Sequence, residues 1–326
     1  MNTEFCSLNL EKSKLMLVVI SHDAGGAEVL SSYVRQRGID CLYVLEGPAR
    51  EIFERKLGPV ETIPIEEAIQ RAASILCGTS WQSDLEFRAI KLARLAGKRS
   101  VAFLDHWVNY HERFVRLNET CMPDEIWVGD SVAEKLATRI FPNTQIKLVE
   151  NPYFHEILEE LAAVSVLRPS DKASISVLYV CEPVREHALQ QFGDERHWGY
   201  VEEEALRYFL ANISALGKTI GRILIRPHPS EPNNKYNWAQ QEFDLPIAQG
   251  GVRPLLEEIA DADVVVGCES MAMVIGLFAN KRVVSCIPPG GKACALPQCE
   301  IERLQSLLEK STIQKKAMED YTSSHE

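Results

Sequence analysis

The sequence predicts an α/β protein with two Rossmann-like halves, each a parallel sheet covered by helices. Short apolar runs, typical of buried parallel strands, alternate along the chain with longer segments of helical periodicity. This alternation is complete near residue 150, gives way to a connection at 151–172, and then starts again. We therefore expect a first domain at 1–150 and a second at 173–326, facing one another. Ligands of such sheets bind at the carboxyl ends of the strands, here in the cleft between the two domains.

The first strand is predicted by the apolar run Leu15–Ile20, and two glycines after it form a tight turn into a helix. Similar runs predict the other strands of this half at 41–45, 74–77, 100–104 and 125–128. Apolar residues at helical spacing predict helices at 27–37, 50–57, 65–71, 85–95 and 132–140. In the second half the same patterns predict strands at 175–180, 223–226, 264–267 and 282–287. They predict helices at 201–216, 252–260, 271–278 and 301–318.

Composition and charge exclude several classes of protein. With 46% hydrophobic and 25% charged residues, the chain of 326 residues can bury a full core, so intrinsic disorder is not expected. The 35 basic and 46 acidic side chains give 35 − 46 = −11, a net charge that repels the phosphate backbone of nucleic acids. Nine cysteines without a C-x-x-C pair indicate reduced thiols, and no zinc spacing with histidine is present. A polar start without a secretory signal agrees with a cytoplasmic protein, and the sequence is compatible with peripheral membrane contact through a small surface patch.

The segment after the first strand opens a helix and contains Gly25 and Gly26. These glycines let backbone N–H groups approach an anionic or polar ligand, although the third glycine of a dinucleotide fingerprint is missing. His22, Asp23 and Glu28 are side chains that can act as a general base on an acceptor hydroxyl. The alternative interpretation is structural, with Asp23 as a helix cap and the glycines forming the turn.

Two further strand ends of the first half carry a concentration of reactive and aromatic side chains. These residues are Thr79, Ser80, Trp81, Glu86, Asp105, His106, Trp107, Tyr110 and Arg113. Hydroxyls, carboxylates, an imidazole and large rings together are more typical of a cleft than of a core. Asp105 and His106 need not touch, because neighbours in a strand point to opposite sides. In the structural alternative the tryptophan side chains pack between the loops, and Asp105 caps the segment after its strand.

The sharpest signal of the second half lies at the end of the strand 223–226. Arg226 precedes His228, which stands between Pro227 and Pro229. The prolines fix the backbone and present the imidazole ring at the strand end. A histidine and an arginine held in this way suit a phosphate, through N–H donation from the ring and a guanidinium fork. The structural alternative is a rigid turn with a surface histidine.

The next strand of this half leads into Glu269, Ser270 and Met271 at a helix start. Backbone N–H groups and the serine hydroxyl form a seat for an anion there, and Glu269 can accept a hydrogen bond from a ribose or base. Taken alone, this pattern is equally that of a helix cap. Combined with His228, it predicts a two-part nucleotide pocket. Glu182 follows the first strand of the same half and is expected to face the same cleft.

The second half resembles the donor half of two-domain GT-B glycosyltransferases. The resemblance rests on the His-Pro turn of Arg226–Glu231, the run 262–267 and Ser270 at a helix start, and it extends over about residues 173–300. It is greatest toward bacterial capsule and lipopolysaccharide enzymes, including sialyltransferases and Kdo transferases that use CMP-sugars. It implies that His228 and Ser270 hold the nucleotide phosphate.

Over residues 1–150 the resemblance is only architectural. The acidic Asp/Glu-Asp/Glu-Gly motif of those sialyltransferases is replaced here by Asp23-Ala24-Gly25-Gly26. Similar halves also occur in hydrolysing UDP-sugar 2-epimerases and in polyol-phosphate transferases, so the fold alone does not choose the activity.

The resemblance implies a metal-independent glycosyltransferase of polysaccharide or glycoconjugate assembly. It would move a sugar from a CMP- or UDP-sugar donor to a glycan or glycoconjugate acceptor and need no cofactor besides this substrate. Asp23 or His22 would deprotonate the acceptor hydroxyl, with Asp105 and His106 as second candidates. One alternative is a sugar-nucleotide 2-epimerase or hydrolase, in which His22, Asp105 and His106 perform the acid–base chemistry. The other is a nucleotide-sugar-binding protein without catalysis.

Overall fold

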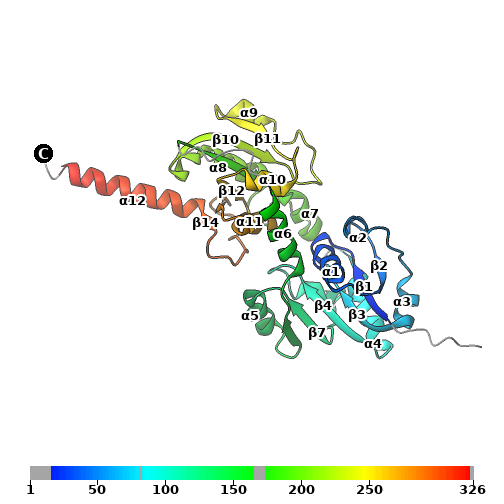
Figure 1. The fold of residues 1–326 in the computed structure, drawn as a ribbon. Coiled ribbons are helices and arrows are strands. Elements are labelled where there is room, and N and C mark those ends of the chain that lie inside the picture. Colours follow the sequence, from blue (N-terminus) through cyan, green and yellow to red (C-terminus); the bar gives the residue numbers. More distant parts are fainter. Residues whose placement is uncertain (1–15, 81–82, 165–172, 324–326) are drawn as a thin grey trace, which may run out of the picture. The chain divides into compact units, whose positions relative to one another are not determined.

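The structure is a computed structural model, and it describes residues 16–80, 83–164 and 173–323. The chain divides into two compact units, Met1–Glu156 and Ile157–Glu326, each with its own six-stranded parallel sheet (Figure 1). The predicted α/β class with two Rossmann-like halves is therefore confirmed. Much of the segment 151–172 forms helix α6 (Pro152–Ala163), and its residues 165–172 lie outside the described part.

The sheet of the first unit has the strand order β2-β1-β3-β4-β7-β8. Its strands are β1 (Met16–Ser21), β2 (Cys41–Leu45), β3 (Ala72–Cys77), β4 (Arg99–Leu104), β7 (Glu125–Val128) and β8 (Gln145–Leu148). Its helices are α1 (Ala24–Arg37), α2 (Ala49–Leu57), α3 (Ile65–Arg71), α4 (Leu85–Leu95) and α5 (Ser131–Ile140). A 3-10 turn η1 (Glu112–Phe114) and a hairpin of β5 (Val115–Arg116) and β6 (Glu119–Thr120) follow β4.

The first sheet is buried on both faces because its central strands carry apolar side chains at successive positions. Val18, Val19 and Ile20 of β1 have no exposed surface, as expected for a parallel strand covered by helices on both sides. The chain passes from β1 outward to β2 and then returns to β3 on the other side of β1. The strand order therefore reverses between β1 and β3, and this switch point is where open α/β sheets bind ligands.

The sheet of the second unit has the order β11-β10-β9-β12-β13-β14, which places its switch point between β9 and β12. Its strands are β9 (Ser174–Val180), β10 (Thr219–Arg226), β11 (Ile247–Gln249), β12 (Val264–Gly267), β13 (Arg282–Ser285) and β14 (Glu302–Arg303). Its helices are α7 (Val184–Phe192), α8 (Glu202–Ala211), the 3-10 turn η2 (Ile213–Leu216), α9 (Trp238–Glu242), α10 (Leu255–Ala260), α11 (Met271–Phe278) and α12 (Leu304–Ser323). No helix in the described ranges is both long and apolar enough to cross a membrane.

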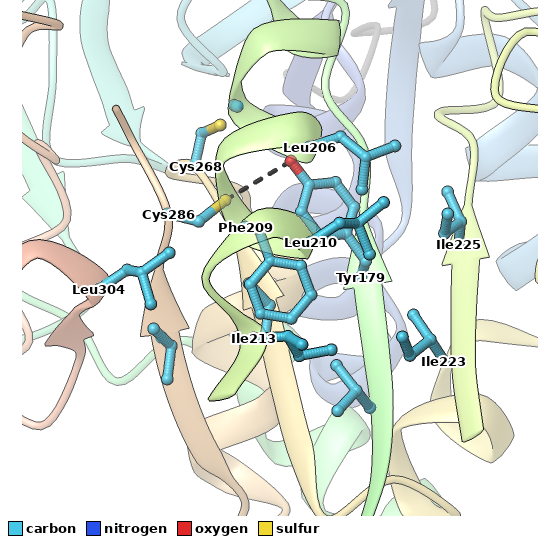
Figure 2. Packing of buried hydrophobic residues seen from close by; sticks show 14 of the residues in the cluster. Tyr179, Leu206, Phe209, Leu210, Ile213, Ile223, Ile225, Cys268, Cys286 and Leu304 are labelled. Atoms are coloured by element: carbon cyan, nitrogen blue, oxygen red, sulfur yellow. Dashed lines mark hydrogen bonds between the residues drawn. The ribbon is translucent and has the colours of Figure 1, made fainter. Parts of the chain in front are cut away.

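The core of the second unit forms where α8 packs against the sheet. Figure 2 shows Leu206 and Phe209 of α8 beside Tyr179 of β9 and Ile223 of β10. The rings of Phe209 and Tyr179 lie 5.7 Å apart between centroids, and the thiol of Cys286 donates a hydrogen bond to the Tyr179 hydroxyl at 3.5 Å. This core supports β9, β10 and β12 from below their carboxyl ends, where the predicted site residues stand.

Several predicted boundaries are wrong for identifiable reasons. The helix predicted at 201–216 ends at Ala211, and Asn212 separates it from the 3-10 turn η2. The helix predicted from residue 252 begins only at Leu255, because Pro254 with its fixed φ precedes the first helical turn. The elements α7, α9, β8 and β11 were not predicted, since they are short or lack a clear apolar period.

Truncation of Phe209 tests the packing of α8. Phe209→Ala is expected to lower the free energy of unfolding of the second unit by about 3–5 kcal/mol, because it removes a fully buried ring and leaves a cavity. Urea denaturation followed by circular dichroism measures the change. Phe192→Ala is the control, because that ring is 45% exposed, and it is expected to cost less than about 1 kcal/mol. Equal losses in the two variants would contradict this account of the core.

Candidate functional site

In the first unit the predicted residues gather at the carboxyl ends of three neighbouring strands. His22 and Asp23 follow β1, Thr79 and Ser80 follow β3, and Asp105 follows β4. The strands β1 and β3 flank the switch point of this sheet. Three segments that are far apart in the sequence therefore contribute to one group of side chains.

Asp23 connects His22 with Ser80. Its Oδ1 lies 2.7 Å from Nδ1 of His22 and accepts a hydrogen bond from the Ser80 hydroxyl at 2.7 Å. Asp23 stands at the N-cap position of α1, but in the structure as described its side chain makes no capping hydrogen bond. The alternative that this carboxylate serves as a helix cap is therefore wrong. A carboxylate bound to Nδ1 orients an imidazole so that Nε2 can take up a proton, as in a histidine base.

Gly47 has no side chain, and this leaves room for the His22 ring. A Cβ atom at this position would lie 2.6 Å from Nε2 of His22, and Gly47 has a φ of +52°, in the left-handed region that favours glycine. The position of the ring therefore depends on a residue in the loop after β2 as well as on Asp23.

Asp105 is held by Arg113 and Thr79. The buried guanidinium of Arg113 donates from Nη1 to Asp105 Oδ1 at 2.7 Å and to Thr79 Oγ1 at 2.6 Å. The other carboxylate oxygen, Oδ2, faces the first turn of α1, where a Cβ atom on Gly25 would lie only 1.9 Å from it. The positive end of the helix dipole stabilises a negative charge at this place. The close approach that was predicted for a ligand at Gly25 is thus made by Asp105 of the chain itself.

The other predicted residues of the first unit have partners near their own strand ends. A Cβ atom on Gly26 would lie 3.2 Å from Cα of Gly78, so this glycine serves the packing of α1 against the end of β3. Nδ1 of His106 accepts the backbone N–H of Trp107 at 3.0 Å, which ties the histidine to its own loop. The indole of Trp107 donates to Asp130 Oδ2 at 2.8 Å. Trp81 lies outside the described residues.

Glu28 is placed in an ion pair with α2 rather than with His22 and Asp23. Its carboxylate lies 2.7 Å from Nζ of Lys56 and also pairs with Arg55. These contacts join α1 to α2, so the structure gives Glu28 a role in packing.

In the second unit Glu182 fills part of the predicted anion seat. Glu182 follows β9, and its Oε1 accepts the backbone N–H groups of Cys268 and Glu269, after β12, at 3.0 and 2.8 Å. Burial is the largest cause that raises the pKa of Glu182 to about 7, and the neighbouring carboxylate of Glu269 also raises it. The backbone donors expected to bind a ligand are therefore already engaged by a carboxyl group of the chain.

Ser270 and Glu269 have partners within the same unit. The Ser270 hydroxyl accepts the backbone N–H of Ala272 at 3.2 Å, so the interpretation of Ser270 as a helix cap is confirmed. Glu269 forms an ion pair with Lys292. Met271 is the first residue of α11.

His228 stands at the end of β10 with a defined ring orientation. Its Nδ1 lies 2.8 Å from the hydroxyl of Ser230 and accepts the backbone N–H of the same residue at 3.2 Å. The backbone N–H of His228 donates to Glu231 Oε2 at 2.9 Å. Burial lowers the pKa of His228. A neutral ring whose Nδ1 accepts a hydrogen bond carries its proton on Nε2, which makes Nε2 a donor for a ligand.

Arg226 is partly engaged by a residue that the sequence analysis did not single out. Its Nη1 donates to the buried carboxylate of Glu258 at 2.8 Å and to the carbonyl oxygen of Arg253 at 2.8 Å. Glu258 also accepts the backbone N–H of Gly251 at 2.8 Å, so it fixes the loop after β11 beside Arg226. Considering the described residues alone, Nε and Nη2 of Arg226 make no hydrogen bond.

His187 is a candidate that the sequence analysis missed. Its ring lies 6.5 Å from that of His228 between centroids, and burial lowers the pKa of both histidines. It belongs to α7, an element without a clear apolar period. The sequence did contain one indication, because His187 lies only a few residues after the carboxyl end of β9.

The two groups of residues suit different chemistry. The second unit presents N–H donors from His228 and Arg226, which suit an anion. The first unit presents an oriented imidazole and carboxylates, which suit proton transfer. In the parts of the chain that the structure describes, no cluster of three or more histidine, cysteine, aspartate or glutamate residues could hold a metal ion.

Comparison with known proteins relates the fold to solved structures. No family model matches the sequence, and neither does any curated protein. The UDP-GlcNAc 2-epimerase from Methanocaldococcus jannaschii is 10% identical, with a TM-score of 0.54 over 82% of this chain and 83% of that one. S. aureus MnaA, in a co-structure with UDP, is 10% identical, with a TM-score of 0.58 over 91% and 87%. A putative UDP-N-acetylglucosamine 2-epimerase from Listeria monocytogenes is 11% identical, with a TM-score of 0.51 over 82% and 78%.

These similarities extend over both units. The chain has a GT-B-like fold. At identities of 10% and 11% the solved structures establish this shared architecture alone. The narrower resemblance to sialyltransferases and Kdo transferases stays a prediction.

The raised pKa of Glu182 predicts how stability depends on pH. The carboxyl binds its proton more tightly in the folded chain, with a pKa of about 7 against an ordinary value of 4.5. Wild-type stability is therefore expected to fall as the pH rises from about 4.5 to about 7, and to stay lowered above that range. Glu182→Gln keeps an oxygen acceptor without the charge, so it should melt at a higher temperature than the wild type at pH 8.

Thermal melts at pH 5 and pH 8 measure the effect of Glu182→Gln. The gain at pH 8 is expected to disappear at pH 5, where the wild-type carboxyl holds its proton. Glu300→Gln, at an exposed glutamate of the same unit, is the control and should change neither melt. A difference between Glu182→Gln and the wild type that is the same at both pH values would contradict the assignment.

Proposed function

We propose that the chain is a nucleotide-sugar enzyme, and specifically a glycosyltransferase that moves a sugar from a CMP- or UDP-sugar to a glycan or glycoconjugate acceptor without a metal ion. The observation that carries the proposal is the fixed ring of His228, which offers its Nε2 N–H at the carboxyl end of β10. Nucleotide binding is assigned to the second unit and proton transfer to the first.

The proposed nucleotide site uses donors that make no hydrogen bond to any residue the structure describes. His228 donates from Nε2, and Arg226 donates from Nε and Nη2. The N-terminus of α11 behind Ser270 adds its dipole, so that the leaving phosphate is neutralised without a cation. Glu269 accepts from the ribose or base. Other residues proposed to contact the nucleotide are Pro229 and Met271. The co-structure of MnaA with UDP, a protein of similar fold, supports the binding of a nucleotide.

The proposed proton transfer uses the His22–Asp23 pair. Nε2 of His22 takes the proton of the acceptor hydroxyl while the acceptor oxygen forms a bond to the anomeric carbon of the donor sugar. The bond from this carbon to the phosphate oxygen breaks, and the nucleotide leaves with the electron pair. Asp23 stabilises the imidazolium that results. Asp105 and His106 are the second candidates for the base.

A sugar-nucleotide 2-epimerase or hydrolase is the second candidate function. The solved structures compared above include two named as UDP-GlcNAc 2-epimerases, one of them putative, and this favours the class. Such an enzyme needs no acceptor. Incubation with a nucleotide sugar alone separates the two activities, because rapid release of free nucleotide or formation of an epimer occurs only in the second.

Nucleotide binding by the wild type and by His228→Ala tests the assigned site. In a thermal-shift panel of CMP, CDP, UDP, GDP and ADP, a ligand at 100 times its Kd stabilises the chain by about 2.7 kcal/mol. We expect a pyrimidine nucleotide to raise Tm in the wild type and not in His228→Ala. His197→Ala, at an exposed histidine of the same unit, should keep the rise. No rise with any nucleotide would contradict the proposal.

Replacement of Asp23 tests the assigned base. Asp23→Asn should leave nucleotide binding unchanged and lower kcat by about 10²–10⁴-fold, because the amide does not stabilise a protonated His22. Steady-state kinetics with the active nucleotide sugar measures kcat, and the thermal-shift panel measures binding. Asp40→Asn, at an exposed aspartate of the same unit, is the charge-matched control. Unchanged turnover in Asp23→Asn would remove this pair from the mechanism.

A further inference from the structure

Glu86 is a buried glutamate attached to the backbone of His22. It is the second residue of α4, and its side chain lies in the interior, with 3% of the residue exposed. Oε1 accepts the backbone N–H of His22 at 2.7 Å. The other oxygen, Oε2, is buried and has no hydrogen-bond partner among the residues described. A buried carboxylate oxygen without a donor is costly, so these surroundings favour a carboxyl group that keeps its proton.

The groups around Glu86 carry charges of both signs. They are His22 and Asp23 at the end of β1, Cys77 on β3, and Arg116 on β5. Burial is the largest cause that raises the pKa of Glu86 to about 7. The negative charge of Asp23 raises this pKa further, and a positive charge on His22 lowers it. The protonation of Glu86 and that of His22 are therefore linked.

We propose that Glu86 is a positioning residue for the His22–Asp23 pair. Through Oε1 it fixes the backbone of His22 at the end of β1, so that the imidazole side chain is attached at a fixed position. While it holds a proton, it adds no second negative charge beside Asp23. Once it ionises, it places a second negative charge beside Asp23 and the His22 ring. The inference rests on the proposed function only in naming His22 as the base.

The NMR signal of His22 reports the ionisation of Glu86 beside the ring without any assay of activity. The Cε1–H signal of His22 is followed from pH 5 to pH 9 in the full chain and is assigned by its loss in His22→Gln. Glu86→Gln keeps an oxygen acceptor for the His22 N–H but carries no charge at any pH. We expect the wild-type signal to move near pH 7, where Glu86 ionises, and this movement to be absent in Glu86→Gln. Identical curves in the two proteins would overturn the proposal.

Two controls keep the test decisive. Glu66→Gln removes a charge from α3, which packs beside α4, at a side chain that is 67% exposed, and it should keep the movement of the His22 signal near pH 7. Loss of this movement in Glu66→Gln would overturn the specific role of Glu86. If Glu86→Gln does not fold, NMR of the side-chain carboxyl carbon of Glu86 in the wild type replaces it. A midpoint near pH 7 is expected, and a midpoint near the ordinary 4.5 overturns the proposal.

Failure of this inference and failure of the proposed function give different results. If no nucleotide sugar is turned over, the function is contradicted, and the movement of the His22 signal near pH 7 still supports the role of Glu86. If the enzyme is active and the curves of the wild type and Glu86→Gln are identical, the role of Glu86 is contradicted while the function stands. When both hold, the pH profile of kcat in Glu86→Gln should lack an inflection near pH 7 that the wild type shows.

Discussion

Backbone N–H groups beyond the ends of parallel strands have no partner in the sheet, and in this chain carboxyl groups of glutamates accept several of them. The glutamates and the residues they hold are Glu86 with His22, Glu182 with Glu269, and Glu231 with His228. A hydrogen bond to a carboxyl oxygen away from water is stronger than the same bond in water. The loops of the candidate site therefore hold their side chains in place without regular secondary structure. The cost is a set of buried acids, and two of them have a pKa raised to about 7.

The same carboxylates limit how an anion can bind. Asp105 faces the first turn of α1, and Glu182 occupies backbone donors before α11. The N-terminus of α1 and that of α11 are therefore not open to a phosphate. In the second unit the main donors are then the ring of His228 and the Arg226 nitrogens that bond to none of the described residues, with the dipole of α11 acting over a longer distance. Because the pKa of Glu182 is about 7, part of its population is neutral at pH 7 and opposes a bound phosphate less than a fixed charge would.

The sequence predicted the parts of this arrangement that depend on local pattern. Alternating apolar runs indicated the two sheets, and the rule that ligands bind beyond strand ends indicated His22, Asp23 and Ser80. The sequence did not predict which side chains contact one another, because these contacts depend on distances across the fold. Asp23 was predicted as a candidate base with a helix cap as the alternative, and only the structure shows Ser80 2.7 Å from it. Glu28 was predicted as a further candidate base, and the structure places it beside Lys56. His187 was missed because the periodicity of α7 is too weak to predict its helix.

The position of a bound nucleotide tests the central claim most directly. In a crystal structure of the full chain grown with UDP or CMP, the account predicts a phosphate oxygen within about 2.7–3.2 Å of Nε2 of His228. It also predicts Nε or Nη2 of Arg226 beside the same phosphate. A nucleotide bound away from the carboxyl ends of β10 and β12 would contradict the claim, and so would the absence of a nucleotide at saturating concentration.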